Sequence, residues 1–192
     1  MAPEKKEIER KFRVMNFSPE LIPADSTSVS ILQTYLVCEG PGERRVRYTT
    51  HGWHSPSTYH YTEKLPTGES GTRIERERKI DFAEYQSLYR ERDKTLLTIW
   101  KTRHSFSFGG KTLELDVFKC ELCGLVMLEI ELQHRNEEIT LPPGWKLIEV
   151  TDHPAYKNYA LAKRGKKPHA SYWFNCILEK LSQLFYRYTA GD

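Results

Sequence analysis

The sequence predicts a mainly β protein of the α+β class, in which antiparallel strands close into a barrel and helices flank it. Two observations support this prediction. Short runs of alternating apolar and charged residues follow one another along the chain, with turn residues between them. The charges are also sorted, because several runs gather acidic residues on one face while others gather basic ones. Like charges on one face repel unless cations lie nearby, so the two kinds of face are expected to enclose a shared polar interior.

The strands can be placed in order from the alternation and from the turns that end each run. The second run ends at the Gly and Pro residues after Glu39, and Gly109 with Gly110 forms a hairpin turn. Cys120 and Cys123 are interpreted as part of a turn, because no second cysteine pair or nearby histidine completes a metal site. The predicted strands are residues 7–12, 29–37, 45–49, 59–64, 73–80, 97–106, 111–118, 125–133 and 146–151.

Helices are predicted at four places. Ser18 and Pro19 start a short helical turn. Asp81 caps a helix that runs to about Lys94, in which apolar residues repeat every three or four positions. A third helix covers residues 156–164, and a fourth, amphipathic helix covers residues 171–188.

The composition fits one folded domain with an appendage. The chain has 192 residues, of which 39% are hydrophobic and 29% are charged, and its net charge is only +3. We expect a barrel domain over residues 1–165 and a C-terminal helical extension over 166–192, which would cap the barrel, mediate dimerisation or lie on a membrane surface. No apolar run could span a membrane and no signal peptide is recognisable, so a cytoplasmic monomer or homodimer is expected.

The sorted charges favour a metal and phosphate site over a solvated outer face. One acidic pair on an exposed strand would mean little, but four pairs occur beside several basic residues. Carboxylates without accompanying Cys or His select Mg²⁺ or Mn²⁺, while Arg and Lys bind phosphate oxygens. The acidic pairs are Glu7 with Glu9, Glu75 with Glu77, Glu114 with Asp116, and Glu129 with Glu131; the basic residues are Lys11, Arg45, Arg47, Lys64, Arg73 and Arg103.

These residues resemble the CYTH superfamily, also called triphosphate tunnel metalloenzymes, whose hallmark is an N-terminal Glu-x-Glu-x-Lys motif. The resemblance extends from about residue 5 to residue 164 and is greatest to the short bacterial tripolyphosphatases. It is carried by Glu7-x-Glu9-x-Lys11, Gln33-Thr34-Tyr35-Leu36, Arg45-Val46-Arg47, Lys64, Glu75-Arg76-Glu77, Arg103, Glu114-Leu115-Asp116-Val117-Phe118, Glu129-Ile130-Glu131-Leu132, Glu149-Val150-Thr151 and Tyr156-Lys157-Asn158.

The resemblance implies an eight-stranded antiparallel tunnel that hydrolyses a triphosphate, with inorganic tripolyphosphate as the first-choice substrate. The open alternatives are an adenylate cyclase, a thiamine, nucleoside or RNA triphosphatase, and a non-catalytic polyphosphate-binding module; nucleic acid would enter only through a 5′ triphosphate. The resemblance implies catalytic roles for Glu7, Glu9, Lys11 and Lys64, triphosphate binding by Lys11, Arg45, Arg47, Lys64, Arg73 and Arg103, and metal binding by Glu7, Glu9, Glu75, Glu77, Glu114, Asp116, Glu129 and Glu131.

Overall fold

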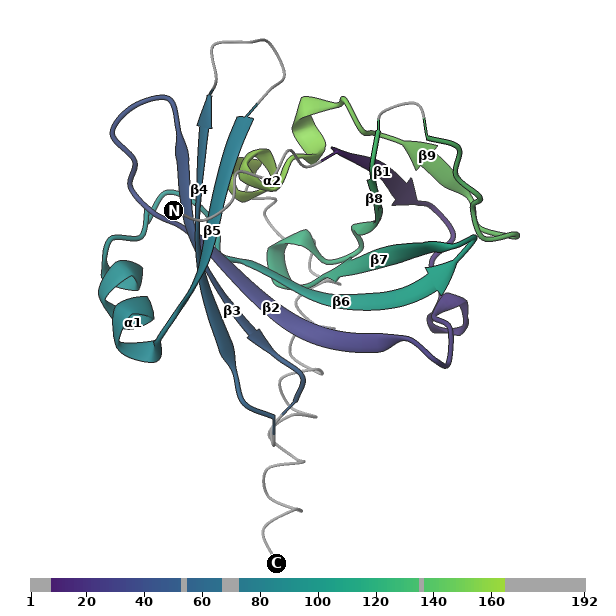
Figure 1. The fold of residues 1–192 in the computed structure, drawn as a ribbon, viewed down its shortest axis with the longest axis horizontal. Coiled ribbons are helices and arrows are strands. Elements are labelled where there is room, and N and C mark those ends of the chain that lie inside the picture. Colours follow the sequence, from purple (N-terminus) through teal and green to yellow (C-terminus); the bar gives the residue numbers. More distant parts are fainter. Residues whose placement is uncertain (1–7, 53–54, 67–72, 135–136, 165–192) are drawn as a thin grey trace, which may run out of the picture.

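In the part of the chain that the structure describes, the fold is a single, strongly curved antiparallel sheet of nine strands (Figure 1). The computed structural model describes residues 8–52, 55–66, 73–134 and 137–164. The strand order is β5-β4-β3-β2-β6-β7-β8-β1-β9. The strands are β1 (Ile8–Val14), β2 (Thr27–Tyr35), β3 (Glu43–Thr50), β4 (Thr58–Pro66), β5 (Arg73–Ile80), β6 (Ile99–Phe108), β7 (Lys111–Phe118), β8 (Val126–Leu132) and β9 (Leu147–Glu149).

The prediction of a closed eight-stranded barrel is corrected in two respects. The sheet has nine strands, and among the described residues its two ends, β5 and β9, do not pair with each other. The physical reason lies at the outer edge of β1. There β9 pairs with residues 12–14, the Val150 N–H donates to the Lys11 carbonyl at 2.8 Å, and the Lys11 N–H donates to the Thr151 hydroxyl at 3.0 Å. This stretch of β1 therefore has no free edge to offer to β5.

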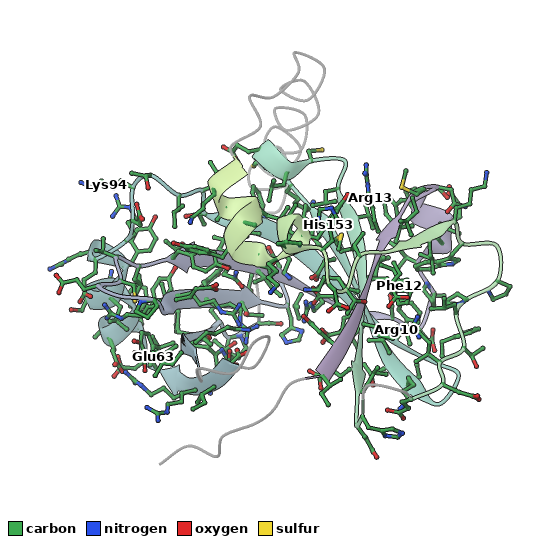
Figure 2. All side chains as sticks on the ribbon, turned by 90° about the horizontal axis from the view of Figure 1, so that it is seen from above. Arg10, Phe12, Arg13, Glu63, Lys94 and His153 are labelled. Carbon is green, nitrogen blue, oxygen red and sulfur yellow. The ribbon has the colours of Figure 1, made fainter. Side chains whose placement is uncertain are left out.

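The curvature of the sheet gives it a concave face between two walls. We call β3, β4 and β5 the first wall, and β6, β7, β8 and β1 the second wall; β2 joins them (Figure 1). Residues that oppose each other in antiparallel pairs lie on the same face of a sheet, so the register fixes which side chains line the concave face. Figure 2 shows the side chains that cover both faces of the two walls.

Apolar side chains cover the outer, convex face. On the second wall, alternate residues such as Leu113, Leu128 and Ile130 are fully buried beneath the segment that carries Trp145. On the first wall, Val46 lies in an apolar cluster with α1 (Phe82–Arg90). Burial of this kind stabilises by about 25 cal/mol per Å² of apolar surface, so these layers hold the curvature of the sheet.

Helix α2 (Asn158–Arg164) packs at one end of the concave face (Figure 1). Its Leu161 and Ala162 lie in a buried cluster with Tyr35, Ile99 and Met127. The register places Tyr35, Ile99 and Met127 on the concave face. Helix α2 therefore covers the apolar end of that face, and the charged side chains lie next to the covered end.

The helix predictions are largely confirmed. Asp81 caps α1 by accepting a hydrogen bond from the Glu84 N–H at 2.8 Å, although the helix ends at Arg90 and not at Lys94. Among the described residues there are three short 3₁₀ helices; the first is the helical turn predicted at Ser18 and Pro19, and the second forms the predicted turn that contains Cys120. Their bounds are Pro19–Leu21, Cys120–Leu122 and Pro154–Tyr156.

Two predictions fall outside the residues that the structure describes. These are the acidic residue Glu7 and the C-terminal extension at 166–192. Within the described ranges, the longest helices are too short and too polar to cross a membrane.

Candidate active site

The register brings the predicted charged residues onto one continuous concave face. On the second wall, Lys11 lies opposite Glu129, and Glu129 lies opposite Glu114 on its other side. On the first wall, Arg45 opposes Thr62, which opposes Glu77. The predicted residues that share this face are Glu9, Lys11, Arg45, Arg47, Lys64, Arg73, Glu75, Glu77, Arg103, Glu114, Asp116, Glu129 and Glu131, with Arg73 placed by its backbone position alone.

Arg103 is the central cation of the second wall. Its Nε donates to Asp116 Oδ1 at 2.7 Å, and its Nη2 donates to Asp116 Oδ2 at 2.7 Å and to Glu129 Oε2 at 2.6 Å. Its remaining nitrogen, Nη1, donates to Glu114. One guanidinium thus joins three carboxylates from β7 and β8, an arrangement that requires the planar fork of arginine.

Lys11 connects β1 to the same network. Its ammonium lies 2.8 Å from Glu129 Oε1 and 3.0 Å from Glu9 Oε1. Burial alone would lower the pKa of Lys11, but Glu129 and Glu9 outweigh it and raise that pKa. Lys11 therefore remains charged within the site.

The first wall carries a second ionic network. Arg45 Nη2 lies 3.2 Å from Glu75 Oε1, and Arg47 Nη2 lies 2.8 Å from Glu77 Oε1. Lys64 Nζ lies 2.5 Å from Glu75 Oε2. The Nε atoms of Arg45 and Arg47 are buried without a hydrogen-bond partner, so each arginine has an N–H that an anionic ligand could satisfy.

The two walls differ in charge. On the concave face of the first wall, the register places five cations with three carboxylates: Arg45, Arg47, Lys64, Arg73 and Lys79 with Glu43, Glu75 and Glu77. On the concave face of the second wall, the register places four cations with five carboxylates: Lys11, Arg13, Lys101 and Arg103 with Glu9, Glu114, Asp116, Glu129 and Glu131. The first wall therefore favours an anion, and the second wall favours a cation.

Lys101, which was not among the predicted site residues, lies on the concave face two residues from Arg103. Its ammonium forms an ion pair with Asp116, and both residues are buried, with relative exposures of 3% and 0%. Burial, and after it Arg103, lowers the pKa of Lys101 against the opposing effect of Asp116. The signal was available, because Lys101 and Arg103 show the same two-residue spacing as Arg45 and Arg47.

The carboxylates of the second wall differ in acidity. Burial would raise the pKa of Glu129, but Lys101, Lys11 and Arg103 reverse this effect and hold the pKa far below its usual value. The pKa of Glu114 is raised, chiefly by burial, although Arg103 opposes the shift. Glu129 is thus a permanent anion, whereas Glu114 is the acidic side chain that is more easily protonated.

These opposite shifts predict a break in the pH dependence of stability. As the pH falls toward 4.5, the usual value for glutamate, Glu114 takes up a proton more readily in the folded state and adds stability. Below pH 4.5, the unfolded chain protonates at Glu129 before the folded one does, so stability is lost. The free energy of unfolding, measured with urea at pH 6, 4.5 and 3.5, should fall over the last interval because Glu129 resists protonation in the folded state. The fall should be smaller in Glu129→Gln, and an equal fall in that variant would contradict the assignment.

The concave face has the donor chemistry for Mg²⁺ or Mn²⁺, but its carboxylates are paired with cations. Within the described ranges, no three Asp, Glu, His or Cys side chains are grouped closely enough to hold a metal ion. The reason is visible in the networks, where Lys11 and Arg103 occupy the Glu129 oxygens. Hard oxygen donors suit these ions, so the residues fit a metal once the cations turn to another anion.

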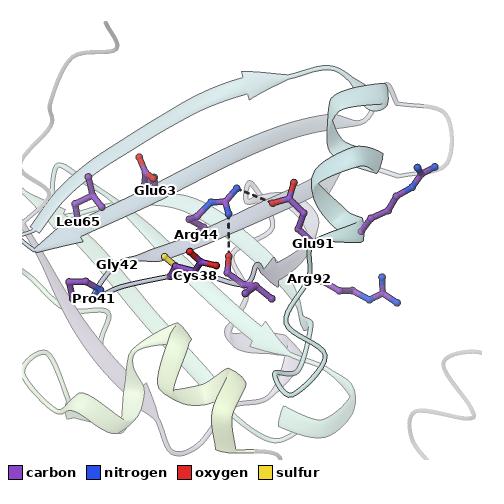
Figure 3. A pocket seen from close by; sticks show the side chains of 11 residues that line it. Cys38, Pro41, Gly42, Arg44, Glu63, Leu65, Glu91 and Arg92 are labelled. Carbon is purple, nitrogen blue, oxygen red and sulfur yellow. Dashed lines mark hydrogen bonds and ion pairs between the residues drawn. The ribbon is translucent and has the colours of Figure 1, made fainter.

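A groove of about 650 Å³ lies on the opposite, convex face beside the end of α1 (Figure 3). Its residues include Arg44, Glu63 and Glu91. Arg44 is already bound to the Tyr61 hydroxyl at 2.9 Å, the Val37 carbonyl at 3.1 Å and Glu91 at 3.2 Å. The sorted charges of the concave face do not extend into this groove.

An antiparallel sheet whose concave face gathers acidic and basic residues is the architecture of a triphosphate tunnel protein of the CYTH superfamily. The inorganic triphosphatase of Nitrosomonas europaea is 34% identical over 159 residues, which cover 81% of this chain and 96% of that protein. The inorganic triphosphatase of Acetivibrio thermocellus is 33% identical over 162 residues, covering 84% of this chain and 96% of that protein. This chain belongs to the inorganic triphosphatase family within that superfamily.

A solved structure agrees with this assignment. The crystal structure of the inorganic triphosphatase NE1496 matches with a TM-score of 0.57 and 29% sequence identity, covering 83% of this chain and 95% of that one. A scan against family models gave no match.

Proposed function

We propose that the protein hydrolyses a triphosphate, with inorganic tripolyphosphate as the first substrate, to orthophosphate and diphosphate in the presence of Mg²⁺ or Mn²⁺. One observation supports this most directly: a single concave face carries a wall with surplus cations and a wall with surplus carboxylates. A polyphosphate chain with its divalent ion needs both kinds of charge. The two related proteins are named inorganic triphosphatases, and this name describes an enzyme that acts on such a substrate.

The cations of both walls would bind the phosphate chain. Arg45, Arg47 and Lys64 would bind it from the first wall, and Lys11 with Arg103 from the second. Phosphate oxygens would replace the carboxylates that these cations now contact. Because one phosphate chain would contact both walls at once, the substrate is proposed to lie between them on the concave face.

The carboxylates released by this exchange would hold the metal. Glu9, Glu129 and Glu131, together with Glu7, are the principal ligands in this proposal, and Glu75, Glu77, Glu114 and Asp116 complete the acidic set. When bound, the metal supplies Lewis-acid polarisation and a more acidic water. The Arg and Lys side chains of the two walls would align the terminal phosphoryl group and stabilise the charge that develops on the leaving diphosphate.

A substrate panel tests the proposal against its alternatives. Tripolyphosphate, ATP, thiamine triphosphate and long-chain polyphosphate are each incubated with Mg²⁺ or Mn²⁺, and the products are identified. Orthophosphate and diphosphate from tripolyphosphate are expected. Cyclic AMP with diphosphate from ATP would indicate a cyclase, and binding without turnover under either ion would indicate a binding module.

The arginine pair of the first wall gives a second prediction. Arg45→Ala with Arg47→Ala should raise the Kd for tripolyphosphate by at least about 100-fold, since each charge-assisted hydrogen bond contributes about 1.5–3 kcal/mol. Calorimetric titration measures the change. Arg44 precedes this pair on the same strand and its side chain lies on the convex face, so Arg44→Ala serves as the control. Unchanged affinity in the double variant would contradict both hydrolysis and simple binding at this site.

A further inference from the structure

The concave face of the first wall becomes more basic along its strands, in three rows that the register defines. The first row is Glu43, Lys64 and Glu75. The second row is Arg45, Thr62 and Glu77. The third row is Arg47, His60 and Lys79, which contains no acidic residue.

The charge of the rows follows from their members. The first row holds two carboxylates and one ammonium, and the second holds one carboxylate and one guanidinium. The third holds two cations and an imidazole. A chain of phosphates lying along these rows would therefore meet growing positive charge with distance from Glu75.

His60 lies in the third row and is not part of the ionic network of the first wall. It lies between Arg47 on β3 and Lys79 on β5, and its Nδ1 is buried without a hydrogen-bond partner. A buried polar atom without a partner is uncommon in folded proteins and indicates a missing ligand or water. Burial, followed by the neighbouring Arg47, lowers the pKa of His60, Lys79 adds to this effect, and Glu77 opposes it. These are the charged groups of β3 and β5 that act on the ring.

The three rows together are longer than a chain of three phosphoryl groups. Adjacent rows are two residues apart along a strand, so the three rows extend over about 14 Å at about 3.4 Å per residue. Lys79 is exposed on β5, at the end of the pairing order, so the third row is open to a longer chain.

We propose that Arg47, His60 and Lys79 form an additional phosphate subsite, which binds a fourth phosphoryl group and makes linear polyphosphates longer than three units ligands of this protein. The inference rests on the proposed function, which places the triphosphate on the second wall and along the first wall as far as Arg47. Arg47 would then contact the fourth phosphoryl group as well, together with His60 and Lys79. His60 and Lys79 lie outside every ion pair assigned to triphosphate binding. They therefore determine the preference for chain length.

Calorimetric binding of tripolyphosphate and linear tetrapolyphosphate to the full chain tests the subsite independently of turnover. The wild-type protein should bind tetrapolyphosphate at least about 10-fold more tightly. Lys79→Gln and His60→Gln should each reduce this ratio to about 3 or less, while the Kd for tripolyphosphate changes less than about 2-fold. Arg76→Gln removes a positive charge from the same strand on the convex face and should preserve the ratio.

The outcomes separate the subsite from general electrostatics. An equal loss of affinity for both ligands in Lys79→Gln or His60→Gln would overturn the subsite, as would a wild-type ratio near 1. If neither ligand is hydrolysed but the ratio follows the prediction, the proposed function fails while the subsite stands. Circular dichroism of each variant confirms that the chain remains folded.

Discussion

Replacing Arg103 with lysine should lower kcat/KM for tripolyphosphate by at least about 100-fold. The guanidinium donates to Asp116, Glu129 and Glu114 from four N–H positions, and an ammonium cannot reproduce this fork. In the proposed complex these N–H groups donate to phosphate oxygens, and two lost charge-assisted hydrogen bonds to the substrate, at about 1.5–3 kcal/mol each, account for this loss or more. Steady-state phosphate release measures it.

A matched control exists outside the concave face. Arg10 donates from two nitrogens to Glu149, at 2.9 and 2.6 Å, on the other face of β1. Arg10→Lys makes the same chemical change in the same kind of fork, and its activity should equal that of the wild type. If Arg103→Lys and Arg10→Lys have equal activity, Arg103 is a structural residue and not a substrate ligand.

Arg103→Ala should also affect folding. It would leave buried carboxylates with less compensation, and Asp116 and Glu129 have relative exposures of only 0% and 9%. Removing one partner of a buried ion pair costs about 3–5 kcal/mol. Lys101 still compensates Asp116, so the loss should lie near the lower end of that range. The lysine variant, which keeps the charge, is therefore the better test of function.

The second large effect is expected for Glu129→Gln, which should lower kcat by at least about 100-fold at saturating substrate and metal. Glu129 accepts from both Lys11 and Arg103, and the proposed metal site needs its charge. The amide keeps the shape of the side chain but not the charge, so the two cations lose a shared partner. The loss should appear in kcat for both Mg²⁺ and Mn²⁺.

Glu149→Gln provides the control, since that carboxylate pairs with Arg10 outside the concave face. It should leave kcat within about 2-fold of the wild type. If Glu129→Gln retained wild-type kcat and wild-type metal dependence, the second wall would not be the metal-binding side.

Alternation along the chain predicted the strands well because the period of a strand is two residues, and each charged run placed its acids or bases on one face. Runs such as Glu75-Arg76-Glu77 have no apolar stripe, yet they are strands in the sheet. The predicted ninth run, at residues 146–151, is β9, which pairs with β1. The eight-strand count came from the resemblance and not from the alternation.

Other features depend on contacts between distant residues, which local patterns do not encode. Part of the outer edge of β1 pairs with β9. Next to it, the Lys11 N–H donates a hydrogen bond to the hydroxyl of Thr151, which lies 140 positions further along the chain. The burial of Lys101 against Asp116 depends on the pairing of β6 with β7. The position of His60 between Arg47 and Lys79 depends on the pairing of β4 with β3 and β5. The types of residue in the site were therefore predictable, but their pairing was not.

The most direct test of the account is the stoichiometry of products released from tripolyphosphate by the purified protein. With Mg²⁺ or Mn²⁺, orthophosphate and diphosphate should appear in a one-to-one ratio, and a chelator should abolish their release. The absence of both products with either ion, while tripolyphosphate still binds, would contradict the proposal that the two charged walls form a triphosphatase site.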